Sequence, residues 1–367
     1  MKKYLLPLII LLFTTGLWAQ SNGNYVYNFL CYNYSSRIAG LGSNLISVYD
    51  DDPSIIMTNP SLISQRHHSS LLLNFTNYYT GTNYASALYS HTFDKVGSFA
   101  FEMRYVGYGK FTRTDVSGLE TGTFHANDLA ATVGWGRELG PNFSIGANLK
   151  LIYCGYADYN SFGLAVDVAG TYHNEKKNLS LSLLFKNIGS ELKPFTPGNF
   201  EKLPFDIQLA FSQKFAHLPV RYHISLHSLY KWNMAYTGSD NPLYSKDAIS
   251  GEVQTPSKVA TFFDNMFRHV VVGIEIIPVK YLSLYFAYNH NIHQEMKIPQ
   301  KRSFAGFSYG FMINIRSIQF GFSRNHYAVG AVPNNFTFSL NLDEVGKLSK
   351  ENKEKKLTRK INIQEEK

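Results

Sequence analysis

The sequence has few cysteines and, beyond its start, no long apolar run. Its two cysteines among 367 residues, Cys31 and Cys154, are too few for a disulfide framework. A bridge between them is possible, but two unpaired buried thiols are the favoured interpretation. Since a membrane-spanning helix needs about 20 consecutive apolar residues, nothing after residue 20 predicts one.

The sequence also lacks a concentrated basic segment, although its formal net charge is +8. The last residues, 343–367, hold eight Lys or Arg and six Asp or Glu. Such a mixed-charge segment has little to bury and predicts a solvated tail. No nucleic acid is therefore expected as a partner.

The first residues have the composition of an export signal. A basic start is followed by an apolar run over 4–13 and by small residues up to Ala19. This order is typical of a secretory signal peptide, which we expect to be cleaved between Ala19 and Gln20. No cysteine follows the cleavage point, so a lipid anchor is not expected there. The mature chain is predicted to be exported.

Most of the remaining chain alternates between apolar and polar residues. Over 98–105, the odd positions are all Phe, Met or Tyr, whereas the even positions include Glu102 and Arg104. Similar alternation returns over 143–153, 221–232 and 336–342. Because successive side chains of a strand point to opposite faces, each segment predicts a strand with one apolar and one polar face.

A soluble sandwich and a lipid-facing barrel would both give this alternation, and two features favour the barrel. Many of the strands reach ten residues, which suits a tilted membrane crossing of about 9–11 residues. Aromatic residues also gather near strand ends, where lipid headgroups favour amphipathic rings. They are Tyr78, Tyr79, Tyr105, Tyr108, Tyr153, Tyr156, Tyr230 and Trp232.

The alternation predicts fourteen strands, an even number as expected for a single-chain antiparallel transmembrane β-barrel. They are placed at 69–79, 82–92, 96–108, 122–138, 142–156, 160–173, 178–187, 204–215, 219–232, 267–278, 281–291, 303–316, 317–327 and 334–342. Short turns fall at every second junction. The long connections are 109–121, 188–203, 233–266 and 292–302.

The phase of short and long connections predicts the orientation of the barrel in the outer membrane. Short turns are periplasmic and long loops external, so both the N- and the C-terminus are expected in the periplasm. The longest external loop, 233–266, is a candidate for docking a surface partner, since aromatic anchors among polar residues are typical of binding surfaces. The candidate docking residues are Tyr236, Tyr244, Phe262 and Phe263.

The segment before the first strand differs from the rest of the chain. Gly40 and Gly42 allow tight turns or close approach. Asp52 followed by Pro53 predicts the start of a short helix, which Asn59-Pro60 would end. Such an element would fill the lumen of a fourteen-stranded barrel.

The acidic triplet in this segment has two interpretations. We expect Asp50, Asp51 and Asp52 to serve in capping and in pairing with lumen arginines such as Arg37 or Arg104. A calcium site is the weaker alternative, because three consecutive carboxylates lack the alternating ligand spacing of a calcium loop.

These motifs resemble the N-terminal plug of the FadL-like outer-membrane barrels, strongly over 25–64 and diffusely elsewhere. The matching residues are Ser36-Arg37-x-Ala39-Gly40-Leu41-Gly42, Asp50-Asp51-Asp52-Pro53-Ser54 and Asn59-Pro60-Ser61-Leu62. Ser61 stands where the family usually has alanine, and Gly40 where it often does. The resemblance implies a fourteen-stranded barrel with a plug. Together with the patterns above, this divides the chain into a signal peptide (1–19), a plug (20–68), a barrel (69–342) and a charged periplasmic tail (343–367).

That family includes long-chain fatty-acid transporters and components of the type IX secretion system. The stretch "YNFL" at 27–30 favours the secretion branch. The resemblance then implies a non-enzymatic subunit of the attachment complex, which holds the surface subunit PorZ together with PorV and the sortase PorU. That complex releases cargo and attaches it to lipopolysaccharide. Transport of hydrophobic molecules is the alternative.

Three further motifs are weighed and declined. The sequence 306–310 matches a hydrolase elbow, but it lies in an alternating strand rather than at a strand-to-helix turn. His223 and His227 are about 13 Å apart on a strand, too far to share one ion. His67 and His68 point to opposite sides. No catalytic residue, metal site or cofactor is therefore predicted.

Overall fold

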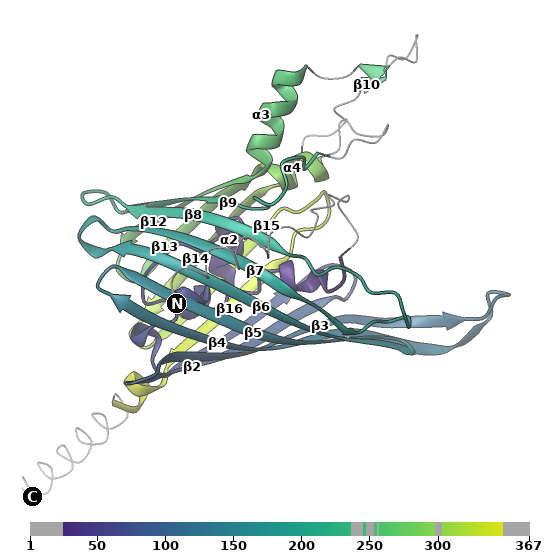
Figure 1. Cartoon of the computed structure of the whole chain (residues 1–367), viewed down its shortest axis with the longest axis horizontal. Helices are drawn as coiled ribbons and strands as arrows, with labels where there is room; N and C mark the ends of the chain where they lie inside the picture. Colours follow the sequence, from purple (N-terminus) through teal and green to yellow (C-terminus); the bar gives the residue numbers. More distant parts are fainter. Residues whose placement is uncertain (1–24, 236–244, 247–252, 255–256, 298–302, 348–367) are drawn as a thin grey trace, which may run out of the picture.

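The computed structural model describes residues 25–235, 245–246, 253–254, 257–297 and 303–347, so the expected cleavage site at Ala19 and Gln20 lies outside it. Within these ranges, fourteen antiparallel strands close into a barrel in which β1 pairs with β16 (Figure 1). They are β1 (Ser70–Asn77), β2 (Asn83–Phe93), β3 (Gly97–Thr114), β4 (Glu120–Gly140), β5 (Phe143–Tyr156), β6 (Tyr159–Asn174), β7 (Leu179–Lys193), β8 (Asp206–Lys214), β9 (Val220–Leu226), β12 (Val270–Val279), β13 (Leu282–Asn289), β14 (Phe307–Ile315), β15 (Ile318–Asn325) and β16 (Asn334–Asn341). No helix in the described part is long and apolar enough to cross a bilayer.

The outer face and the lumen face of the barrel wall differ in polarity, as the alternation predicts. In β3, Phe101, Met103 and Tyr105 are 48%, 51% and 46% exposed on the outside, whereas Glu102 and Arg104 are buried in the lumen. A soluble sandwich would bury the aromatic face instead. The closed barrel with an apolar outer surface therefore excludes the sandwich.

All fourteen predicted strands are present, but the predicted long loop at 109–121 is wrong. There β3 and β4 continue as a projecting hairpin with a turn at 115–119. Phe111 and Phe124 face each other across the hairpin with ring centroids 5.3 Å apart. Asp115 closes the turn by accepting from the backbone N–H groups of Ser117 and Leu119. The packing of the two rings and the hydrogen bonds of Asp115 thus extend the pairing of β3 with β4 into the predicted loop.

The predicted aromatic girdle is confirmed only in part. Tyr79 and Tyr105 are exposed on the outside, as expected. Tyr78, Tyr108 and Tyr156 instead turn inward and pack against a buried cluster in the lumen. Tyr108 shows the reason, since its hydroxyl donates to the buried carboxylate of Asp128 (2.5 Å). A polar lumen partner holds the ring away from the lipid.

The connections divide the barrel into two ends. One end, here called the turn end, carries short turns and η5 (Glu175–Lys177), and the last strand ends there. The opposite loop end carries a two-stranded sheet, β10 (Ser245–Lys246) with β11 (Val253–Gln254), and the helices α3 (Lys258–Arg268) and α4 (His290–Met296) (Figure 1). Of the C-terminal tail, 342–347 forms a helical turn, and the rest lies outside the described residues.

Short helices form the segment inside the barrel, which we call the plug (residues 25–69). They are η1 (Asn28–Cys31), α2 (Ser36–Gly40), η2 (Pro53–Ile55), η3 (Pro60–Leu62) and η4 (Gln65–His67). The helix α2 contacts β13 to β16, whereas η3 contacts β4 to β6. The plug therefore bridges opposite walls of the lumen.

Candidate functional site in the barrel lumen

The plug runs through the lumen from the loop end to the turn end. At the loop end, the backbone of Tyr25 forms an isolated β-bridge with Lys202, and the hydroxyl of Tyr25 lies 2.9 Å from that of Tyr230. At the turn end, His67 lies shortly before β1, and its backbone oxygen accepts a hydrogen bond from the hydroxyl of Ser90. Among the described residues, Tyr25 and Asn341 thus lie at opposite ends of the barrel. Both termini lie outside the described residues, so their periplasmic location stays a prediction.

An aromatic cluster fills the lumen near the loop end. Tyr27, Phe29, Leu30 and Tyr34 of the plug pack against wall residues such as Tyr84. The hydroxyl of Tyr27 lies 2.5 Å from Ser161 Oγ, and burial raises the pKa of Tyr27 to about 12. These phenols stay neutral, so this part of the plug is held by apolar packing and neutral hydrogen bonds.

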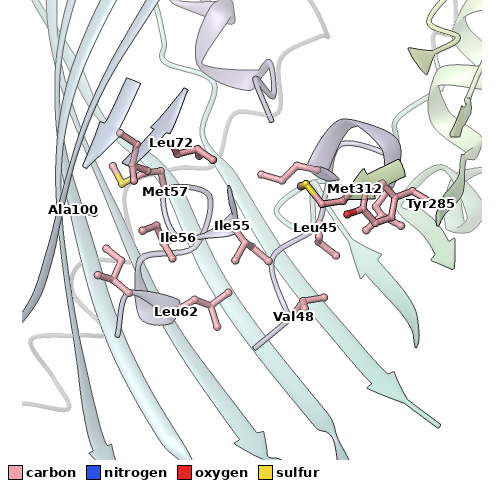
Figure 2. Packing of buried hydrophobic residues seen from close by; sticks show 14 residues of the cluster. Leu45, Val48, Ile55, Ile56, Met57, Leu62, Leu72, Ala100, Tyr285 and Met312 are labelled. Carbon is pink, nitrogen blue, oxygen red and sulfur yellow. The ribbon is translucent and has the colours of Figure 1, made fainter. Parts of the chain in front are cut away.

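A second cluster anchors the middle of the plug to the wall through apolar contacts. Nine of its members come from the plug and five from the strands. Figure 2 shows Ile55, Ile56 and Leu62 of the plug lying between the wall residues Ala100 and Tyr285. Full burial of one such aliphatic side chain contributes about 1.5–3 kcal/mol, so the cluster holds the plug firmly.

Arg37 is the centre of a buried charge cluster at the turn end. Its guanidinium donates to Asp50 (2.7 Å), to Asp52 (2.9 Å) and to Glu275 of β12 (3.1 Å). Arg221 of β9 completes the group by donating to Asp50 (2.7 Å) and Glu275 (2.8 Å). We call these five residues the Arg37 cluster. It ties α2, the acidic triplet and the wall together.

The charges in this cluster stabilise one another. Burial by itself would raise the pKa of Asp50, but the guanidinium groups of Arg37 and Arg221 hold it far below its ordinary value. Burial would likewise lower the pKa of Arg37, yet Asp50, Glu275 and Asp52 outweigh this effect and raise it. Asp50 and Arg37 therefore stay charged at neutral pH, and each buried charge of the cluster has a partner.

The capping and pairing predicted for the acidic triplet are confirmed for Asp52 and Arg37. Asp52 caps η2 by accepting from the backbone N–H of Ser54 (2.9 Å). Asp51 points outward to Arg66 instead. The other predicted partner, Arg104, does not reach the triplet, because Glu102 of its own strand engages it (2.6 Å).

The remaining plug motif residues also have defined structural positions. Asn59 caps η3 by accepting from the N–H of Ser61 (3.0 Å), and Pro60 is the first residue of that helix. The backbone N–H of Ser36 donates to Thr337 of β16 (2.8 Å). Gly42 has a φ of +84°, and a Cβ there would lie 2.5 Å from Val271. Its lack of a side chain permits both the turn and the close approach.

A polar cavity of about 740 Å³ opens at the turn end beside the Arg37 cluster. Its lining includes Asp50, Arg221, Glu275, Lys214, Lys280 and Arg316. The chemistry of these groups suits water and ions rather than an apolar solute.

The motifs set aside in the sequence have defined positions in the fold. Among the described residues, no group of three or more His, Cys, Asp or Glu could hold a metal ion, so the calcium alternative finds no support. His223 is buried and its ring contacts the backbone oxygen of Leu41 (3.0 Å). In the elbow-like motif, Ser308 faces the lumen on β14 and accepts from Asn325 (3.0 Å).

The cysteines are both free, but only one is buried. Cys154 lies within the aromatic cluster of the lumen, as expected. Cys31, at the end of η1, is exposed rather than buried.

The predicted docking residues divide into two pairs. Tyr236 and Tyr244 lie outside the described residues. Phe262 and Phe263 lie on α3 and are 51% and 49% exposed. Their contacts are taken up below.

Comparison with known proteins bears on the fold. No family profile and no curated protein matches the sequence. Among solved structures, the toluene transporter TodX of Pseudomonas putida aligns with a TM-score of 0.51 at 13% identity, covering 84% of this chain and 98% of TodX. The chain has the FadL-like outer-membrane fold. A second TodX structure gives a TM-score of 0.50 at 11% identity over 85% of this chain and 99% of that one. A FadL homologue of Pseudomonas aeruginosa gives 0.46 at 11% identity, over 87% and 98%.

Sequence reasoning missed the wall partners of the plug. Glu275 and Arg221 were not singled out, although both occupy lumen-facing positions in alternating strands. A charged residue at such a position is the signal that could have identified them. The pairing of Glu275 with Arg37, 238 positions away, and of Arg221 with Asp50, 171 positions away, depends on the barrel fold and has no local signal.

Proposed function

We propose that this chain is a non-enzymatic outer-membrane anchor that resembles PorQ of the type IX secretion system. Its role would be to hold a PorZ-like surface subunit in an attachment complex with PorV and PorU. That complex would release cargo and attach it to lipopolysaccharide. The sequence resemblance over 25–64 supports this assignment, since these residues build the plug.

The observation that carries the proposal is the filling of the lumen by the plug. Within the described residues, apolar clusters join the plug to the wall near the loop end and in the middle, and the Arg37 cluster closes the turn end. The cavity that opens there is lined by charged and polar groups. An apolar solute would have no apolar path past these contacts, whereas an anchor needs none.

Transport of hydrophobic molecules is the second candidate, and the fold comparison favours it over the attachment role. TodX, which shares the fold, is a toluene transporter. Transport by this chain would require the plug to rearrange, because the Arg37 cluster and the apolar contacts hold it in the lumen. The two candidates therefore differ in what the lumen must do.

The docking role is tested by co-purification from detergent-solubilised outer membrane. Replacing Tyr236 and Tyr244 by serine should release the surface subunit into the medium without lowering barrel abundance. The matched control is Val116→Ser with Leu119→Ser, two exposed apolar residues on the projecting hairpin of β3 and β4. Full retention of the subunit after removal of 236–252 would contradict docking through this loop.

Transport is tested with the purified chain in liposomes. We expect no uptake of toluene or of a long-chain fatty acid above that of empty liposomes. Uptake that rises with the amount of protein, and rises further when Arg37 is replaced by alanine, would make transport the function and the anchor role wrong.

A further inference from the structure

The helix α3 has its polar and apolar sides reversed relative to a helix of a soluble protein. Its apolar residues recur every three or four positions and so share one face. Val259, Phe262, Phe263 and Phe267 on this face are 66%, 51%, 49% and 49% exposed. A soluble protein would turn such a face toward its core.

The opposite face of α3 is polar and is held against the protein. Asn265 is buried and accepts from the backbone N–H of Met234 (3.0 Å). Arg268 is also buried, and it donates to Asp264 (2.7 Å) and to Asn291 of α4 (3.4 Å). The contacts of Asn265 with Met234 and of Arg268 with Asn291 fix the rotation of the helix, so the outward direction of the phenylalanines is built into the fold.

The position of α3 along the barrel axis corresponds to the membrane surface. The strand β12 begins two residues after α3 and has ten residues, or about 33 Å of strand at ~3.3 Å per residue. A tilt of about 40° reduces this to roughly 25 Å, the height of the apolar band of an outer-membrane barrel. The helix therefore ends where the strand enters the hydrocarbon. Figure 1 shows it running across the strand direction at the rim.

The apolar face of α3 also continues the lipid-facing surface of the wall. Val272 and Ile274 of β12 are 41% and 43% exposed on the outside of the barrel. Trp232, 48% exposed, lies 5.1 Å from Phe262 between ring centroids. Tryptophan is enriched at membrane interfaces, where its ring meets both apolar and polar surroundings.

We infer that α3 is an interfacial helix whose phenylalanine face is buried in the outer leaflet of the membrane. Interfacial helices of this kind insert their apolar face about 5–10 Å, to the boundary of headgroups and acyl chains. The helix fixes the root of the longest external connection at the membrane surface. Phe262 and Phe263 then contact lipid, and docking of a surface partner is left to the part of the connection that precedes α3.

Quenching of a single tryptophan by brominated lipid tests this inference. The variant carries Phe263→Trp, with Trp18, Trp135 and Trp232 replaced by phenylalanine. The full chain is reconstituted in phosphatidylcholine vesicles brominated near the headgroup end of the acyl chain. We expect a marked loss of fluorescence relative to unbrominated vesicles. The matched control is Val116→Trp in the same background, on the exposed turn between β3 and β4, which should lose none.

Two outcomes would overturn the inference. Quenching of the Phe263→Trp variant no greater than that of the control would place α3 in water. Loss of the surface subunit from a Phe262→Ser and Phe263→Ser variant, without quenching in the tryptophan variant, would assign the face to a protein partner. Retention of the subunit together with quenching supports lipid contact, and it leaves the separate test of docking through Tyr236 and Tyr244 unaffected.

Discussion

Three consecutive aspartates in the plug have three different roles. Asp50 and Asp52 face the Arg37 cluster with side chains 24% and 11% exposed, whereas Asp51 is 77% exposed and meets Arg66 at the surface. The extended backbone before η2 turns alternate side chains to opposite sides. The three aspartates should therefore contribute differently to the stability of the plug, according to how deeply each is buried.

Replacing these aspartates singly should reveal the difference. Asp50→Ala leaves the buried Arg37 and the half-buried Arg221 short of a partner, and it should cost the plug about 3 kcal/mol, as for other broken buried pairs. Asp51→Ala should cost at most ~1 kcal/mol, as for exposed pairs. Hydrogen exchange of 36–64 measures both, and heat-modifiable migration on a gel checks that the barrel still forms. Equal losses of protection would contradict the assignment.

Acid should loosen the plug in two stages. Burial lowers the pKa of His67, so protonation favours the open plug and stability falls as pH drops below about 6.5, the ordinary value for histidine. The pKa of Asp50 is also lowered, so its contribution is present above about pH 4 and is lost as pH falls further. Protection factors of 36–64, corrected for intrinsic exchange, measure this. His67→Gln should remove only the first stage.

At the scale of elements, the plug depends on a sharp turn directly after α2. The helix ends at Gly40, and Gly42 reverses the chain with its positive φ close to Val271 of β12. Helices commonly end at a glycine in the left-handed conformation. The turn directs the segment after Gly42 back along the inside of the barrel wall, so that the acidic triplet meets Arg37.

Gly42→Ala should therefore disturb the plug more than an equivalent change elsewhere. The new Cβ would lie 2.5 Å from Val271 in addition to the backbone strain, so the cost should exceed the ~1 kcal/mol of positive φ alone. Gly81→Ala, at a φ of +78° with open space around it, is the control. Protease resistance of the plug measures both variants. A Gly42→Ala plug as resistant as that of Gly81→Ala would contradict the close packing.

At the scale of the whole molecule, the plug enters at one end of the barrel and leaves at the other. Tyr25 lies at the loop end, and the chain reaches β1 at the turn end. Since β1, which follows the plug directly, closes the barrel by pairing with β16, the turn end of the plug is fixed to the seam of the barrel.

The orientation of the barrel can be tested with cysteines at its two ends. In a chain with Cys31 and Cys154 replaced by serine, Val116→Cys at the loop end should react with a membrane-impermeant maleimide on intact cells. Lys176→Cys, on the exposed turn at the opposite end, should react only after the outer membrane is permeabilised. The reverse pattern would invert the barrel and exclude docking of a surface partner through the 233–266 connection.

Much of the fold could be predicted from local patterns in the sequence. Alternation located all fourteen strands, because inward and outward positions of a barrel differ in polarity at every residue. Asp52 and Asn59 could be recognised as caps, since a cap needs only its neighbours. The projecting hairpin was missed, because polar residues outside the membrane carry no alternation even where strands pair.

The sequence by itself determined an alternating chain that closes into a barrel, with a capped and glycine-rich segment before it. The tertiary structure decided how that segment crosses the lumen, which carboxylates meet Arg37, and which way α3 faces. Glu275 meets Arg37, and Arg221 meets Asp50, only because the register of β9 and β12 brings the two wall residues to one level. Local periodicity depends on neighbouring residues, whereas these contacts depend on strand register and on the path of the plug, which no short stretch of sequence encodes.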